Sequence, residues 1–150
     1  MKSFRRILHP TDFSVASRPA FKRALALARN NDASLTILHV IAPFAPILGE
    51  GYIPPRTWES IELQVRSQAQ RELAKLVARA RKAEVRATSL VQEGPAADRI
   101  VRAARARRAD LVAMGTHGRS GLARLVLGSV AERVVGSAPC PVLTVRAGRR

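Results

Sequence analysis

Short apolar runs alternate along this chain with longer stretches of helical periodicity. Residues 35–41 (LTILHVI) and 110–115 (DLVAMG) are nearly continuous apolar runs of strand length. Runs of this kind are typical of strands that are covered on both faces, as in a parallel sheet between two layers of helices. The alternation therefore restricts the chain to an α/β fold, in which each strand is followed by a helix.

The same periodicity predicts five strands, at residues 4–9, 35–41, 85–91, 110–115 and 141–145. We expect four helices: one that begins around Ser14 to Pro19 and stops at residues 30–32, then 58–83, 94–108 and 128–135. Residues 42–57, with four prolines and two glycines, are interpreted as a long loop. This order predicts an open, five-stranded parallel sheet of the flavodoxin or Rossmann type, with strand order 3-2-1-4-5 and helices on both faces.

The size and composition of the chain are those of an ordinary globular domain. A length of 150 residues is expected for a single domain that covers residues 1–150. No apolar run approaches the roughly 18 residues of a membrane span, and the N-terminus lacks the pattern of a secretory signal. The single cysteine, Cys140, permits no intrachain disulfide and is expected to be a small packed residue. These features predict a cytoplasmic protein without membrane insertion.

In open parallel sheets, ligands bind outside the carboxyl ends of the strands, where the strand order reverses. The ends of the first and fourth strands, at residues 10–12 and 115, should meet there. Residues 115–129 (GTHGRSGLARLVLGS) pass three glycines within seven residues and re-enter a helix at Gly128 and Ser129. A helix that begins there would direct backbone N–H groups at an anion, and Arg119 adds positive charge. The segment is either a phosphate cradle built mostly from backbone or a surface loop with tight turns.

The spacing Gly115-x2-Gly118-x9-Gly128-Ser129 resembles the nucleotide-binding signature of the universal stress protein family. Residues 7–14 (ILHPTDFS) resemble the first strand and acidic turn of that family. The run at 35–41 resembles its second strand, and residues 110–121 (DLVAMGTHGRSG) resemble its fourth strand and loop. Residues 128–146 (GSVAERVVGSAPCPVLTVR) resemble its last helix and strand, so that the similarity covers essentially the whole chain.

The resemblance implies a member that binds ATP, with Mg²⁺ or Mn²⁺ on the phosphates. It implies that Asp12 lies near the ribose and base, where the alternative is that Asp12 only caps a turn, and that Val40 lines the adenine pocket. The implied nucleotide-binding residues are Pro10, Thr11, Asp12, Ser14, Val40, Met114, Gly115, His117, Gly118, Arg119, Gly128, Ser129 and Val130.

Efficient phosphoryl transfer needs a metal clamp, a charge stabiliser and an oriented nucleophile, and the sequence offers only Arg119, as a charge stabiliser. We therefore expect no catalytic residues, slow or negligible hydrolysis, and a role as a nucleotide-dependent regulator or sensor in the stress response. In that role ATP favours one conformation of the 42–57 loop or of a dimer. A slow ATPase or phosphotransferase is the alternative. The spacing of His9, His39 and His117 is not that of a zinc site, so no metal with protein ligands is predicted.

The net charge of +15 favours anionic partners. Five arginines crowd the third predicted helix, which is either a solvated face or a surface for non-specific nucleic-acid binding: Arg99, Arg102, Arg105, Arg107 and Arg108. The last strand, from Pro141 to Val145, would lie at an edge of the sheet, and an apolar edge needs to be covered or paired. Since many relatives pair this strand across a two-fold axis, we expect a homodimer through residues 141–145.

Overall fold

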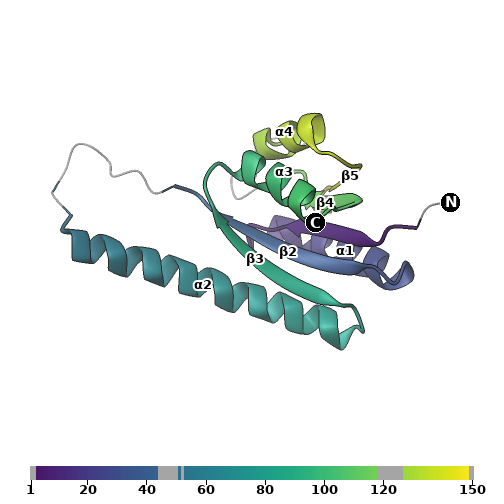
Figure 1. The fold of residues 1–150 in the computed structure, drawn as a ribbon, viewed down its shortest axis with the longest axis horizontal. Coiled ribbons are helices and arrows are strands. Elements are labelled where there is room, and N and C mark those ends of the chain that lie inside the picture. The colour runs from purple at the N-terminus through teal and green to yellow at the C-terminus, as the bar shows by residue number, and fades with distance from the viewer. Residues whose placement is uncertain (1–2, 44–50, 52, 118–126, 149–150) are drawn as a thin grey trace.

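The computed structural model describes residues 3–43, 51, 53–117 and 127–148. Within them, one sheet is formed by the strands β1 (Arg6–Pro10), β2 (Ser34–Ile41), β3 (Ala87–Glu93), β4 (Leu111–Gly115) and β5 (Val142–Val145). The strand order is β3-β2-β1-β4-β5, and every neighbouring pair is parallel (Figure 1). The predicted fold class and strand order are therefore confirmed.

Helices cover both faces of this sheet. They are α1 (Arg18–Asn30), which follows a short 3₁₀ turn at Val15–Ser17, α2 (Pro55–Lys82), α3 (Ala96–Ala106) and α4 (Ser129–Ser137). Helices α1 and α2 pack against one face, and α3 and α4 pack against the other. This arrangement follows from the parallel strands, since each return to the starting edge of the sheet requires a crossover connection.

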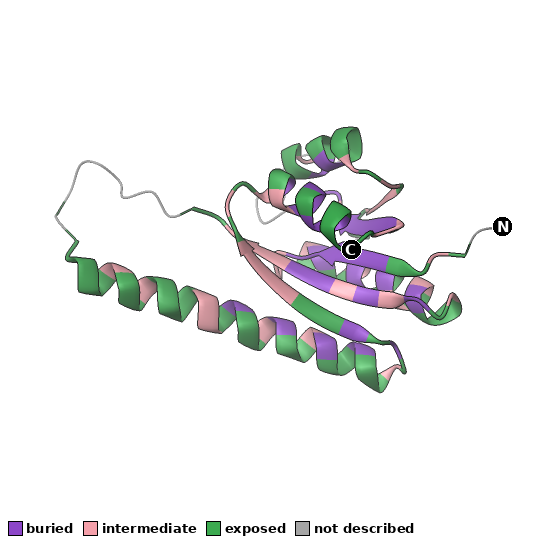
Figure 2. Ribbon diagram, in the orientation of Figure 1, coloured by how far each residue is buried: buried purple, intermediate pink, exposed green. Residues whose placement is uncertain are grey.

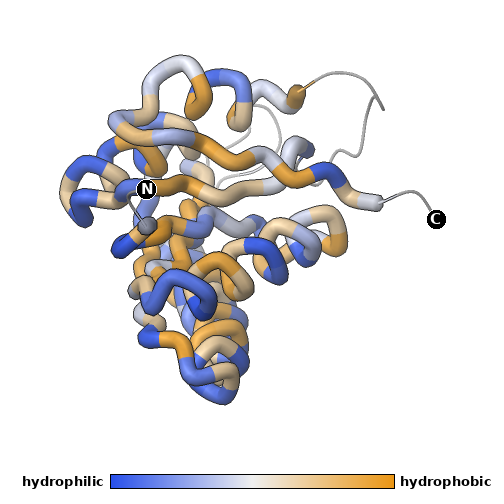
Figure 3. The backbone as a smooth tube through the Cα atoms, turned by 90° about the vertical axis from the view of Figure 1, so that its right-hand side faces the viewer, coloured by the Kyte–Doolittle hydropathy of each residue, from blue (hydrophilic) through white to orange (hydrophobic). Residues whose placement is uncertain are grey.

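The alternation of side chains along each strand divides the core in two. Ile7 contacts the cluster beneath α1 and α2, whereas the adjacent Leu8 contacts the cluster beneath α3 and α4. In β4, Ala113 and Met114 are divided in the same way, because successive side chains of a strand point to opposite faces. The central strands β1 and β4 are therefore largely buried (Figure 2), and hydrophobic positions alternate with hydrophilic ones along the backbone in Figure 3.

Helix α2 is longer at its N-terminus than predicted. The loop was expected to extend to residue 57, but the helix begins at Pro55, because proline is well suited to the first helical position, where no N–H bond is required. The N-terminal half of α2 projects beyond the sheet and is largely exposed (Figures 1 and 2). Its first buried residue is Ala69, and Leu63 is 66% exposed.

Other boundaries also differ from the sequence prediction by one or a few residues, and two of them have a clear local cause. Strand β3 begins at Ala87 rather than at residue 85, because Val85 N–H still donates to the carbonyl of Ala80 in the turn that ends α2. Helix α3 ends at Ala106 rather than at residue 108, because Arg108 adopts a φ of 50°. In the part of the chain that the structure describes, no helix is both long enough and apolar enough to cross a membrane.

Candidate functional site

A cavity of about 280 Å³ opens at the carboxyl edge of the sheet, between the ends of β1 and β4. This is the point at which the chain changes direction across the sheet, with β2 on one side of β1 and β4 on the other. The turn after β1, the strands β2 and β4, and the first residues of α3 and α4 form its walls. Among the predicted residues, those that line the cavity are Pro10, Thr11, Asp12, Val40, Met114, Gly115, His117, Gly128, Ser129 and Val130.

Three other residues were predicted for the site. Gly118 and Arg119 lie outside the described residues. Ser14 does not contribute to the wall, because its side chain caps the 3₁₀ turn, where its hydroxyl accepts a hydrogen bond from Ser17 N–H at 3.2 Å. The role of Ser14 in this structure is thus to shape the turn that carries its neighbours.

The turn after β1 is held by hydrogen bonds between short polar side chains. The carboxylate of Asp12 accepts a bond from Ser14 N–H at 3.0 Å, so that the predicted capping role of Asp12 is present beside its position in the cavity wall. The hydroxyl of Thr11 donates to that of Ser17 at 3.2 Å and accepts from Phe13 N–H at 3.1 Å. These bonds stabilise Phe13 at a φ of 63°, which is uncommon for a residue other than glycine.

The imidazole of His39 also positions this turn. Its Nδ1 lies 2.8 Å from the carbonyl oxygen of Thr11, and its ring stacks on Phe13 with centroids 4.3 Å apart. Since a carbonyl oxygen can only accept, Nδ1 carries the proton in this bond. His39 is therefore a structural support of the crevice.

His9 is fully buried beneath the same edge of the sheet. Its Nδ1 donates to the carbonyl oxygen of Ala113 at 2.8 Å and so links β1 to β4. Burial lowers the pKa of His9 from 6.5 to about 4, although the bond to Ala113 and the charge of Asp12 act in the opposite direction. The ring is therefore neutral at physiological pH. No three His, Cys, Asp or Glu side chains of the described ranges form a group that could hold a metal ion.

The start of α4 supplies the polar side of the cavity. Gly128 is the N-cap of the helix and offers no side chain to the first N–H groups, which belong to residues that line the cavity. Gly128 N–H instead donates to the carbonyl oxygen of Thr116 at 2.7 Å. A Cβ atom at position 128 would lie only 2.8 Å from that oxygen, so the close approach of two backbone segments requires glycine here.

Six residues of the lining were not predicted from the sequence: Ser17, Leu38, Ala96, Ile100, Thr116 and Ala131. Leu38 could have been found, because it lies two residues before Val40 and therefore on the same face of β2. Ala96 and Ile100 lie on α3, and only the packing of that helix places them over the cavity. Leu38, Ile100 and Met114 belong to the core cluster beneath α3 and α4, so the floor of the cavity is apolar.

Cys140 has the packing role that the sequence predicts. It packs at the edge of the cluster beneath α3 and α4. Burial raises the pKa of its thiol, and the negative charge of Asp110 acts in the same direction. The thiol is therefore kept protonated.

The strand order and the position of the cavity define a doubly wound α/β protein with a ligand crevice at its topological switch point. The model of the universal stress protein family matches residues 3–146. Universal stress protein MJ0531 of Methanocaldococcus jannaschii is 38% identical over 145 residues, which cover 95% of this chain and 82% of that protein. A universal stress protein of Thermus aquaticus is 34% identical over 143 residues, with 95% and 99% covered. The chain belongs to the universal stress protein family.

Solved structures share the fold. MJ0577 of Methanocaldococcus jannaschii superposes with a TM-score of 0.81 at 24% identity, over 99% of this chain and 100% of that one. A universal stress protein in complex with cAMP has a TM-score of 0.72 at 24% identity, with 97% and 98% covered. The universal stress protein of Archaeoglobus fulgidus in complex with dAMP has a TM-score of 0.66 at 20% identity, with 97% and 100% covered.

Proposed function

We propose that this chain binds ATP in the cavity between β1 and β4 and acts as a nucleotide-dependent regulator or sensor in the stress response, with slow or no hydrolysis. The observation that carries the proposal is the division of the cavity into an apolar floor and a polar wall. An adenine ring is flat and apolar on its faces, whereas phosphates need N–H donors and positive charge. Two structural relatives were solved with cAMP and dAMP, which both join adenine to a phosphate.

The apolar floor would take the adenine. Leu38 and Val40 from β2, Ile100 from α3 and Met114 from β4 offer side chains on which the ring could stack. Asp12, at the end of β1, would accept hydrogen bonds from the ribose hydroxyls or the base. These assignments keep the predicted roles of Asp12 and Val40.

The polar wall would take the phosphates. The N-terminus of a helix carries a partial positive charge and N–H groups without intrahelical partners. The first residues of α4 line the cavity, and Ala96 brings the start of α3 to it as well. A divalent ion would enter with the phosphates and be held chiefly by their oxygens.

The test is calorimetric titration of nucleotide-stripped protein with ATP and Mg²⁺. Ser129 is exposed in the first turn of α4, where a carboxylate interacts favourably with the helix dipole and should not impair folding. Ser129→Glu would place this charge beside the phosphates, and a repulsion of about 1–3 kcal/mol lowers the affinity roughly 5- to 150-fold. Ser129→Gln, a neutral side chain of the same size, is the matched control and should bind nearly as wild type.

The outcomes separate the parts of the proposal. If Ser129→Glu binds ATP as tightly as wild type, the nucleotide binds elsewhere. If the wild type does not bind, the glycine signature is only part of the scaffold. Phosphate release with Mg²⁺ or Mn²⁺ at roughly 1 per second or faster, lost on changing Arg119 or Asp12, would establish the alternative of an ATPase or phosphotransferase.

A further inference from the structure

A second cleft, of about 490 Å³, lies at the opposite, amino-terminal edge of the sheet. Four arginines line it, and we call it the arginine cleft: Arg6 at the start of β1, Arg81 near the end of α2, Arg86 before β3 and Arg107 after α3. Because all strands are parallel, the turns that follow α2 and α3 come together at this edge. The convergence of these arginines is therefore a consequence of the topology.

The floor of the arginine cleft is a part of the sheet that carries hydroxyl groups. Thr36 of β2 and Thr88 of β3 are partners in the register, and Leu8 of β1 is the next residue across the sheet. Leu8 is buried beneath α3 and α4, whereas Thr36 is half-buried and Thr88 is exposed. The two threonines thus interrupt the apolar face at the point where α3 no longer covers it.

The positive charge of the arginine cleft is only weakly compensated. Arg6 Nε donates to the carbonyl of Arg108 at 2.6 Å, and Arg81 donates to the carbonyl of Ala87 at 3.1 Å. Neither bond neutralises a guanidinium, and the side chain of Arg107 forms no hydrogen bond or ion pair with any described residue.

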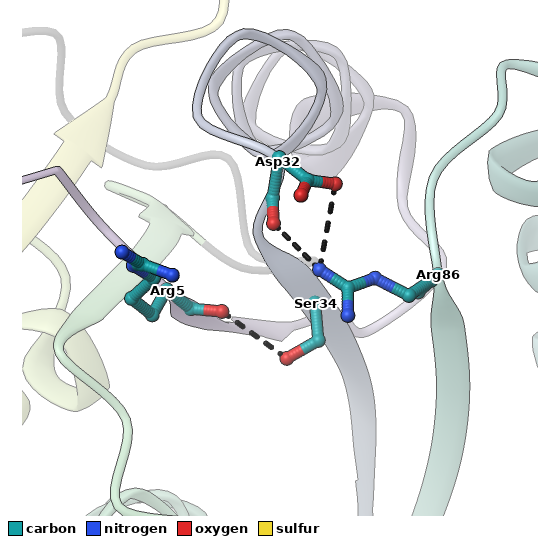
Figure 4. Close-up of polar contacts among 4 residues, drawn as sticks. All are labelled: Arg5, Asp32, Ser34 and Arg86. Carbon is teal, nitrogen blue, oxygen red and sulfur yellow. Dashed lines mark hydrogen bonds and ion pairs between the residues drawn. The ribbon is translucent and has the colours of Figure 1, made fainter.

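Arg86 is the arginine of the cleft that meets a carboxylate. Its guanidinium bonds the carbonyl of Asp32 at 2.6 Å and lies 3.4 Å from the carboxylate, whose side chain is 99% exposed (Figure 4). Such exposed ion pairs contribute little to stability. In the same view Ser34 donates to the carbonyl of Arg5. The nearby carboxylate of Asp110 is occupied by the backbone N–H groups of Arg5 and Arg6, at 2.9 and 3.0 Å.

From this geometry we propose that the arginine cleft is a second anion site, separate from the nucleotide cavity, and that its ligand is a compact polyphosphorylated anion. A guanidinium has five N–H donors, so each arginine retains donors for bidentate bonds to phosphate oxygens. The hydroxyls of Thr36 and Thr88 add donors at the floor. With aromatic residues at 4% of the chain, stacking of nucleic-acid bases contributes little, which favours a ligand recognised by its phosphates alone.

The experiment is calorimetric titration with tripolyphosphate at physiological salt, in the Ser129→Glu background so that phosphate binding in the nucleotide cavity is weakened. The double variant Arg86→Gln with Arg107→Gln removes two guanidinium groups of the cleft. The matched control, Arg23→Gln with Arg102→Gln, removes the same charge from exposed positions of α1 and α3 that do not line the cleft. Thermal unfolding of both variants verifies that they fold.

We expect saturable binding that falls about tenfold for each guanidinium removed from the cleft, as for the loss of a charge-assisted hydrogen bond, and that changes little in the control. Thr88→Glu, which adds a carboxylate to the floor without removing an arginine, should weaken binding as well. Absence of saturable binding, or an equal loss in the control, overturns the proposal. A short DNA duplex that binds more tightly than tripolyphosphate and depends on the same arginines would show a nucleic-acid interface instead.

Discussion

Replacing Gly128 by alanine tests whether this glycine is required by packing or by a ligand. The N–H of Gly128 donates to the carbonyl oxygen of Thr116 at 2.7 Å, and this bond joins the start of α4 to the end of β4. The added Cβ would lie 2.8 Å from that oxygen, whereas ordinary van der Waals contact begins at 3.4 Å. The carbonyl belongs to the backbone, so it cannot move away as the end of a flexible side chain would. The two segments must therefore separate by about half an ångström.

The expected change in the free energy of unfolding is the sum of opposing contributions. Overpacking of a close contact costs about 1–3 kcal/mol, and alanine is also a poorer N-cap than glycine. The φ of Gly128 is −62°, which alanine adopts without strain. Alanine also reduces the conformational freedom of the unfolded chain, which stabilises the folded variant by about 0.4–1 kcal/mol. We expect the free energy of unfolding to fall by about 1–2 kcal/mol, which for a domain of this size lowers Tm by roughly 2–8 °C.

The assay is urea unfolding followed by circular dichroism, with Gly136→Ala as the control. Gly136 lies in the same helix, and a Cβ there would meet no atom within 4 Å. That substitution should stabilise the protein by about 0.5–1 kcal/mol, because glycine is unfavourable within a helix. If Gly128→Ala is as stable as wild type, the contact with Thr116 does not explain the glycine, and a requirement for ligand approach would remain.

The remaining predictions concern pH, a strand-to-strand connection and assembly. His9 binds protons with a pKa of 6.5 when unfolded and about 4 when folded, so its contribution to stability is constant above pH 6.5 and falls by roughly 3 kcal/mol as the pH is lowered to 4. Urea unfolding across this range should show a shallower slope for His9→Phe, and equal slopes would refute the assignment. Asp110→Ala removes the bonds to two backbone N–H groups and should cost about 1–3 kcal/mol. The control Asp98→Ala breaks an exposed ion pair, removes a carboxylate from the first turn of α3, and should cost about 1 kcal/mol or less in thermal unfolding. In the proposed homodimer through β5, the backbone of Thr144 faces away from β4 and would pair with the second copy. Thr144→Pro removes the N–H for this pairing and should give a monomer in light scattering. A monomeric wild type would contradict the proposal.

Much of the fold could be predicted because burial repeats along the sequence with the period of each element. The apolar runs that contain Leu38 and Val112 indicate strands covered on both faces, and the strand order agrees with the structure. Boundaries were less accurate where a local conformation decides them, as at Pro55, which starts α2, and at Arg108, whose positive φ follows the end of α3. Such boundaries depend on one or two residues, and the periodicity of apolar residues therefore does not reveal them.

Some residues of the candidate site could likewise be predicted from the sequence, and others could not. Asp12 and Met114 could be placed at the crevice from the sequence, because they follow or end predicted strands whose carboxyl ends meet. Ile100 could not, because its contribution depends on the angle at which α3 crosses the sheet. The sequence also permits Gly128 to belong to a tight turn that needs no ligand. The physical reason for a glycine in such a turn is the carbonyl of Thr116, which only the structure places beside it.

The sequence by itself determined the α/β class, the parallel sheet and the strand ends at which a ligand site forms, because these depend on which residues must leave water and in what local period they recur. Only the tertiary structure decided which groups from distant segments meet. The contact of Gly128 with Thr116, the bond from His9 to Ala113 and the convergence of Arg6 with Arg107 join residues 12 or more positions apart. Such contacts arise from the way in which packed helices and a twisted sheet fit together, and this fit has no local signature in the chain.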